Sequence, residues 1–173
     1  MIKPYVDIAT TQHNVERMGN MANTNRGKQF ENIVRDCLNK VADTTVIRLH
    51  DQTTGFQGSK NPCDLVVYHH PNQYLLECKS THGNTLPLSN ITDFQYSSLL
   101  EFGTNYGCIA GILCWWIDND VTKFIPIDII KRLKDNGAKS IRYDYDDANI
   151  VSISGVKKRV FFDYDFADLF DSF

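Results

Sequence analysis

The stretch that decides the fold reads NPCDLVVYHHPNQYLLECKS and covers residues 61–80. Two apolar runs, rich in β-branched and aromatic residues, flank the turn-forming residues Pro71 and Asn72. Runs of this kind around a proline-containing turn predict two antiparallel strands, Asp64–His69 and Tyr74–Lys79. The open end of this hairpin therefore carries charged residues.

Three charged side chains are expected to meet at that open end. Alternate residues of a strand share a face, so Glu77 and Lys79 point the same way and Cys78 points to the other side. The predicted turn places Asp64 opposite Lys79 and within reach of Glu77. Two carboxylates and one ammonium group should therefore converge.

Such a group suits the hydrolysis of a phosphodiester bond, because charge on the phosphate must be stabilised while a water molecule is deprotonated. The carboxylate oxygens of Asp64 and Glu77 are ligands that Mg²⁺ prefers, and the backbone carbonyl of Cys78 is a further candidate. Lys79 can lower the pKa of the attacking water, position it, or stabilise the phosphate, and the sequence leaves these roles open. We predict a Mg²⁺ site, with Mn²⁺ as a substitute.

A purely structural interpretation of the same residues is also open. Asp64 can close a loop, and Glu77 with Lys79 can form a solvated strand face. Against this interpretation, the neighbouring residues of both strands are apolar, and charges beside such runs are expected where something compensates them. The spacing of these residues alone favours neither the catalytic nor the structural interpretation. The choice between them therefore depends on the surrounding residues.

Hydrophobic periodicity predicts further elements on both sides of the hairpin. Before it, a helix is expected to start near Asn23 or Thr24, followed by a strand at Thr44–Leu49. After it, we predict helices at Ile91–Phe102 and from Pro126 to Gly137, and strands at Cys108–Trp116, Val121–Ile125 and near Ile150 and Val160. This order predicts an α/β fold with a mixed central sheet flanked by helices. Residues 1–22 are expected to form a flexible arm before a single domain, residues 23–173.

Composition limits the possible classes of protein. The chain has 173 residues, of which 42% are hydrophobic, enough for one ordinary core. It carries no apolar stretch long enough to span a bilayer, so we expect a cytoplasmic protein without membrane contacts. The five cysteines include no CxxC pair, which favours neither a disulfide framework nor a zinc site.

The net charge of −3 argues neither for nor against a DNA-binding protein. Acidic residues concentrate in two segments without basic residues, 143–147 and 163–173. The remainder of the chain can therefore still present a basic face to nucleic acid. Arg26 and Lys28, at the start of the first predicted helix, are candidate DNA contacts, although a solvated helix start is an equal interpretation.

Three blocks of sequence resemble the PD-(D/E)xK nuclease superfamily and, within it, the RecU-like Holliday junction resolvases. The resemblance extends over residues 25–116, and its combination of blocks is more specific than any block alone. The blocks are, in chain order, Asn25-Arg26-Gly27 with Phe30-Glu31, then Asp64 with Glu77-Cys78-Lys79, then Leu86-Pro87-Leu88-Ser89-Asn90 with Gln95. Two departures are Cys63, where the motif has proline, and a short connection between Leu49 and Asp64 in place of a protruding stalk.

The resemblance implies a restriction-endonuclease-like core and a set of roles for the site. Asp64 and Glu77 would bind metal, Lys79 would be the catalytic lysine, Glu31 would assist from its helix, and Gln95 would lie in or beside the site. The implied activity is Mg²⁺-dependent resolution of four-way DNA junctions by paired nicks, which a homodimer suits because it supplies two identical sites. The implied location is the bacterial cytoplasm or a phage-infected cell.

Two other functions remain open at this point. The same chemistry can serve a restriction-type or repair nuclease that acts on duplex DNA, or the fold can persist as a DNA-binding module without catalysis. Two further predictions concern packing: one of Trp115 and Trp116 should contact a partner, and the aromatic tail, residues 161–173, could pack on a partner subunit.

Overall fold

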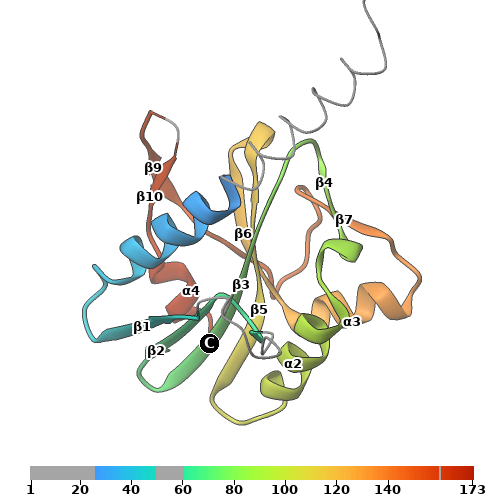
Figure 1. Cartoon of the computed structure of the whole chain (residues 1–173), viewed down its shortest axis with the longest axis horizontal. Helices are drawn as coiled ribbons and strands as arrows, with labels where there is room; N and C mark the ends of the chain where they lie inside the picture. Colours follow the sequence, from blue (N-terminus) through green and yellow to red (C-terminus); the bar gives the residue numbers. More distant parts are fainter. Residues whose placement is uncertain (1–25, 50–60, 160) are drawn as a thin grey trace, which may run out of the picture.

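A six-stranded mixed sheet forms the centre of the computed structural model, which describes residues 26–49, 61–159 and 161–173 (Figure 1). The strand order is β1-β2-β3-β5-β6-β8, and β3 with β5 is the parallel pair among these neighbours. The strands are β1 (Thr44–Arg48), β2 (Leu65–His69), β3 (Asn72–Thr81), β5 (Cys108–Trp116), β6 (Val121–Pro126) and β8 (Val151–Ser152).

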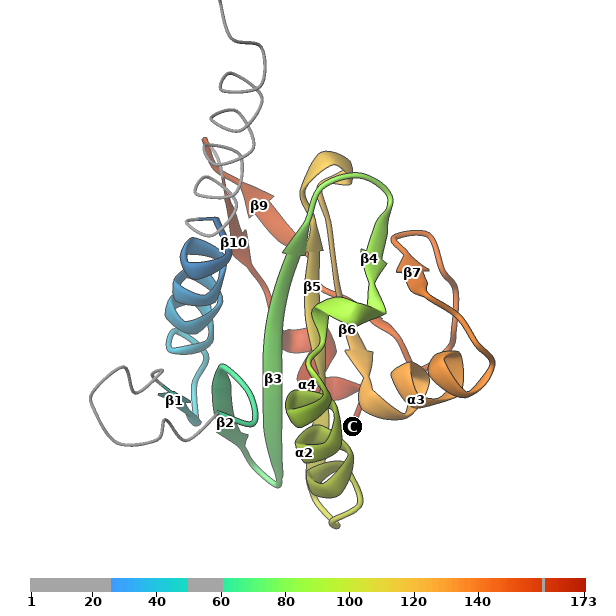
Figure 2. The same ribbon diagram turned by 45° about the vertical axis from the view of Figure 1, so that its right-hand side comes forward.

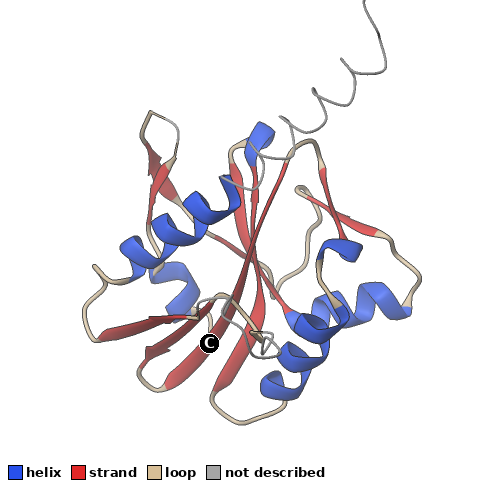
Figure 3. Ribbon diagram, in the orientation of Figure 1, coloured by secondary structure: helices blue, strands red, loops and turns tan. Residues whose placement is uncertain are grey.

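Helices cover both faces of this sheet, as Figure 3 shows. The first helix, residues 26–38, and α4 (Ala167–Asp171) pack on one face through Phe30, Val34 and Leu169. On the other face lie α2 (Asp93–Gly103) and α3 (Ile127–Asp135), which form a second apolar cluster with β5. This arrangement confirms the predicted α/β architecture with a mixed sheet between helices. The predicted arm and the predicted helix start lie outside the described residues.

The hairpin of β2 and β3 is confirmed, but its predicted register is wrong. Leu65 pairs with Leu76, and His69 pairs with Asn72, so the turn consists of His70 and Pro71. The turn is centred one residue earlier than predicted, which shifts the pairing by two residues. Because two residues are a full strand period, every side chain keeps its face.

Two pairs of short strands lie outside the central sheet, and both pairs are antiparallel. The pair β4 (Thr85–Pro87) and β7 (Ser140–Arg142) lies on the face of α2 and α3, and the pair β9 (Gly155–Lys157) and β10 (Phe162–Tyr164) lies on the face of the first helix. Two 3-10 helices, η1 (Leu88–Asn90) and η2 (Ile117–Asn119), follow β4 and β5. Through β4 and β7, the end of α3 is held beside the start of α2.

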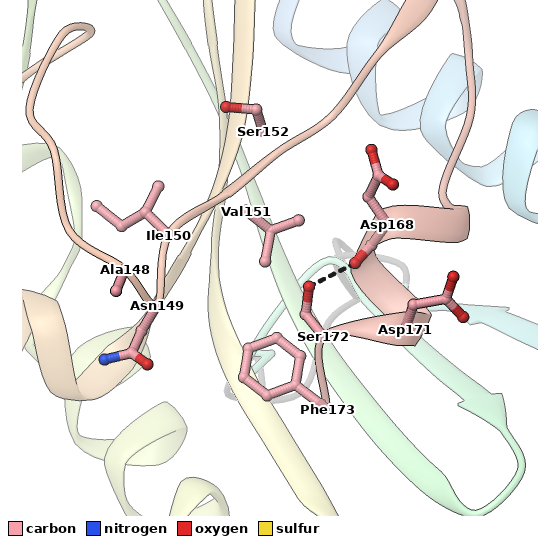
Figure 4. A pocket seen from close by; sticks show the side chains of 9 residues that line it. All are labelled: Ala148, Asn149, Ile150, Val151, Ser152, Asp168, Asp171, Ser172 and Phe173. Atoms are coloured by element: carbon pink, nitrogen blue, oxygen red, sulfur yellow. Dashed lines mark hydrogen bonds between the residues drawn. The ribbon is translucent and has the colours of Figure 1, made fainter.

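The aromatic tail packs largely on its own chain and needs no partner subunit to bury Phe166 and Leu169, while the predicted partner contact stays a prediction. Phe166 and Leu169 are fully buried, and the Phe170 ring stacks on His69 with ring centroids 4.1 Å apart. The tail also borders a cleft of about 410 Å³, in which Asp168 and Asp171 lie near the chain end (Figure 4). None of the predicted site residues lines this cleft.

Both tryptophans are also buried within the chain, which overturns the predicted partner contact for one of them. Trp115 belongs to the cluster beneath the first helix, and Trp116 belongs to the cluster beneath α2 and α3. Successive residues of a strand face opposite sides, and here both sides of the sheet are covered.

No described helix is both long and apolar enough to cross a membrane.

Candidate active site

Glu77 is the centre of the candidate site. It belongs to β3, the strand that runs between the first helix and α2 in Figure 2, and it is only 2% exposed. Its Oε1 accepts hydrogen bonds from Lys79 Nζ at 2.7 Å and from Gln95 Nε2 at 2.6 Å. With the neighbouring acids ionised, Oε2 has no donor among the described residues. Burying an ionised carboxylate whose oxygen has no hydrogen-bond donor costs free energy, unless a cation lies beside it.

Asp64 stands immediately before β2 and is held against β3. Its N–H donates to the Leu76 carbonyl at 3.2 Å, and its Oδ2 accepts from the Cys78 N–H at 2.8 Å. These bonds fix the Asp64 carboxyl beside Glu77. The predicted convergence of Asp64, Glu77 and Lys79 is therefore present, although Asp64 lies opposite Glu77 and not opposite Lys79.

Burial raises the pKa of both acids. Burial, followed by the charges of Glu77 and Glu31, raises the pKa of Asp64 to about 8. Burial also raises the pKa of Glu77, against the opposing effect of the Lys79 ammonium, and a hydrogen bond from protonated Asp64 assists Glu77 in its charged form. Near neutral pH a proton is thus retained between the acids, at a place where a divalent cation can substitute for it.

Gln95 connects the site to the start of α2. The N-cap residue Thr92 accepts from the Gln95 N–H at 3.3 Å, and Gln95 Oε1 accepts from the Thr92 N–H at 3.1 Å. This reciprocal capping box fixes the Gln95 side chain, whose Nε2 then reaches Glu77. The same Oε1 lies 3.5 Å from Lys79 Nζ. Gln95 is therefore in the site, as predicted by resemblance.

Glu31 reaches the site from the first helix and is itself paired. Its Oε2 accepts from Arg48 Nη2 at 2.6 Å, while Arg48 Nη1 donates to Asn32 at 2.7 Å. The Glu31 charge is close enough to raise the pKa of Asp64 and of Glu77. Sequence reasoning missed Arg48, because a single arginine at a strand end gives no periodic or motif signal.

The donor set fits a hard divalent cation. Within one strand residue the N–H and C=O point to the same edge, so the Cys78 carbonyl faces the side on which Asp64 lies. Among residues 26–49, 61–159 and 161–173 no group of three or more His, Cys, Asp or Glu side chains could hold a metal ion. Two carboxylates and a carbonyl still suit Mg²⁺, which commonly uses one or two carboxylates and keeps several waters.

The two candidate DNA contacts lie at the start of the first helix. Lys28 is exposed, and Arg26 Nη1 lies 3.4 Å from His82 Nε2. His82 Nδ1 is 2.8 Å from Asp118, whose pKa is lowered by the Gly83 N–H and then by His82. Sequence reasoning missed this grouping, because its members come from three distant segments. The DNA-binding role of Arg26 and Lys28 stays a prediction.

Comparisons with known proteins found likenesses among solved structures, and no match to a family profile or to a curated sequence. Among solved structures, the chain is similar to Hjc from Archaeoglobus fulgidus, described as a Holliday junction resolvase from an archaeal hyperthermophile. The identity is 21%, the TM-score is 0.45, and the match covers 59% of this chain and 78% of that one.

Proposed function

We propose that this chain is a Mg²⁺-dependent endonuclease with a restriction-endonuclease-like core that resolves four-way DNA junctions. The observation that carries the nuclease proposal is the buried Glu77 carboxylate beside Lys79: its second oxygen has no hydrogen-bond donor among the described residues once Asp64 is ionised. The junction as substrate, the paired nicks and the homodimer rest on the resemblance of the three sequence blocks to RecU-like resolvases.

In the proposed reaction, Asp64, Glu77 and the Cys78 carbonyl would hold the cation. A bound Mg²⁺ supplies positive charge to the scissile phosphate and lowers the pKa of a coordinated water, and Mn²⁺ can substitute for it. Lys79 places its ammonium beside Glu77, where it can orient the attacking water and stabilise charge that develops on the phosphate. Gln95 holds Glu77 in place, and Glu31 keeps a further negative charge close to the cation.

The deciding experiment measures nicking of a synthetic four-way junction and of linear duplex with the same sequence. Wild type should nick the junction with Mg²⁺ and not with chelator. Asp64→Asn should lose about a thousandfold or more of the rate, because one ligand and its charge are removed. Lys79→Met should lose about 10²- to 10⁴-fold. Asp135→Asn, an exposed exchange on α3, is the matched control and should cut like wild type.

Each other function predicts a different outcome of this experiment. Equal cutting of junction and duplex would refute junction selectivity and favour a restriction-type or repair nuclease. The short connection between Leu49 and Asp64 is the sequence feature that favours this second function. If neither substrate is cut and Asp64→Asn changes no metal affinity, the chain is a DNA-binding module and the nuclease proposal is wrong.

A further inference from the structure

A basic cleft lies beside the candidate active site, at the start of α2. Its volume is about 510 Å³. One wall comes from η1 and the first turn of α2, and the other wall comes from the end of α3 and the loop after it. The lining residues are Leu88, Ser89, Ile91, Thr92, Asp93, Lys134, Ala138 and Lys139.

The two lysines of this cleft are not neutralised by carboxylates. Among the described residues, neither Lys134 nor Lys139 takes part in an ion pair, whereas Lys131 on the same helix pairs with Asp135. Lys134 is also held in position, because its Nζ lies 4.0 Å from the centre of the Tyr96 ring. Asp93 is the one acid in the lining, so the cleft has an excess of positive charge.

The cleft is firmly joined to the catalytic residues. Leu88 donates its N–H to the Lys139 carbonyl at 2.9 Å, which fixes the two walls relative to each other. Thr92 lines the cleft and also forms the capping box with Gln95, whose amide contacts Glu77. Contacts from Thr92 to Gln95 and from Gln95 to Glu77 thus connect the cleft with the centre of the site.

We propose that this cleft binds a backbone phosphate of the DNA strand next to the cleaved bond, through Lys134 and Lys139. This inference rests on the proposed nuclease function. Lysines that no carboxylate neutralises, held in a polar cleft, displace the counterions of a phosphate, and this displacement is the main source of affinity for DNA. A strand held here is positioned relative to Glu77 by the rigid start of α2.

The test measures binding of a fluorescein-labelled four-way junction and of a labelled duplex by fluorescence anisotropy. Chelator is present throughout, so that cleavage does not interfere. The double variant Lys134→Ala/Lys139→Ala should bind with a Kd at least about tenfold weaker at about 100 mM salt. The slope of log Kd against log salt should fall by about 1, because one phosphate contact is lost.

The control is the double variant Lys40→Ala/Lys157→Ala, which removes the same charge from the turn after the first helix and from β9. Both of its lysines are exposed and paired with aspartates. Its Kd should stay within about twofold of wild type, and thermal unfolding of both variants should match wild type. An unchanged salt slope in the cleft variant, or an equal loss in the control, overturns the proposal.

The outcomes also separate this inference from the proposed function. If wild type cuts DNA with Mg²⁺ while the cleft variant keeps wild-type Kd and slope, the cleft inference fails and the nuclease proposal stands. If wild type never cuts but its binding depends on Lys134 and Lys139, the nuclease proposal fails and the cleft remains a DNA contact.

Discussion

Two lysine–carboxylate pairs of similar geometry occupy very different surroundings in this chain. Lys79 Nζ lies 2.7 Å from Glu77 on β3, and Lys131 Nζ lies 2.5 Å from Asp135 on α3. The side chains of the first pair are 19% and 2% exposed, and those of the second are 54% and 59% exposed. The same chemical pair is thus buried at one place and solvated at the other.

The difference shows which pair has a role beyond stability. A solvated pair costs little and contributes little, since water screens both charges. Burial removes both charges from water, and the attraction between them need not offset this desolvation cost. Two apolar side chains of similar size often make the fold equally stable. Once Asp64 is ionised, Glu77 moreover keeps one oxygen without a donor among the described residues, and a second acid lies beside it. This arrangement is unfavourable for the protein alone, and the proposed divalent cation would offset its cost.

The largest expected effect is a loss of stability of the metal-free protein as the pH rises. In the folded protein Asp64 retains its proton up to a pKa of about 8, whereas in the unfolded chain its pKa has the ordinary value of 3.8. A raised carboxyl pKa stabilises the fold fully below the unfolded value, and this stabilisation is lost as pH rises through the folded value. Urea unfolding with chelator should therefore show falling stability from about pH 5 to about pH 9.

Asp64→Asn is the variant that isolates this effect, because the amide keeps the shape and cannot ionise. At high pH without metal it should be more stable than wild type, by a few kcal/mol. Mg²⁺ should restore the stability of wild type at high pH and leave the variant unchanged. Parallel stability curves for the two proteins would contradict the assignment of this proton to Asp64.

An intermediate effect is expected at Gln95, which lies between the buried pair and α2. Gln95→Leu should lower the cleavage rate or the Mg²⁺ affinity about tenfold to a hundredfold, because Glu77 loses a hydrogen bond that orients it. Thr92→Ala is the matched control, since it removes the other half of the capping box and costs about 1 kcal/mol of stability. If Thr92→Ala lowers Mg²⁺ affinity as much as Gln95→Leu, Gln95 acts only as a helix cap.

Elements with a long periodic pattern could be predicted from the sequence. The β2–β3 hairpin, β5, β6, α2 and α3 all lie within a few residues of their predicted ranges. Alternation also put Glu77 and Lys79 on one face, and a register error of two residues left that face unchanged. The convergence of the acids was therefore predictable even though the partner of Asp64 was not.

Features that depend on tertiary context could not be predicted in this way. Strands of three residues such as β4 and β7 are too short for a period, and only their pairing defines them. An apolar tail indicates that its side chains are buried, but not which surface buries them. The sequence therefore suggested a partner subunit for Phe166, whereas the structure buries this residue in its own chain. Thr92 and Gln95 differ from these cases, because their spacing is a readable capping-box signal.

The smallest effect is expected at the solvated pair. Lys131→Ala should change the free energy of unfolding by less than about 0.5 kcal/mol, since an exposed pair four residues apart on a helix contributes little and alanine favours the helix. The salt dependence of stability should also stay the same, as measured by urea unfolding at low and high ionic strength. A loss of several kcal/mol would mean that burial is not what separates the two pairs, and that the cost assigned to Glu77 has another origin.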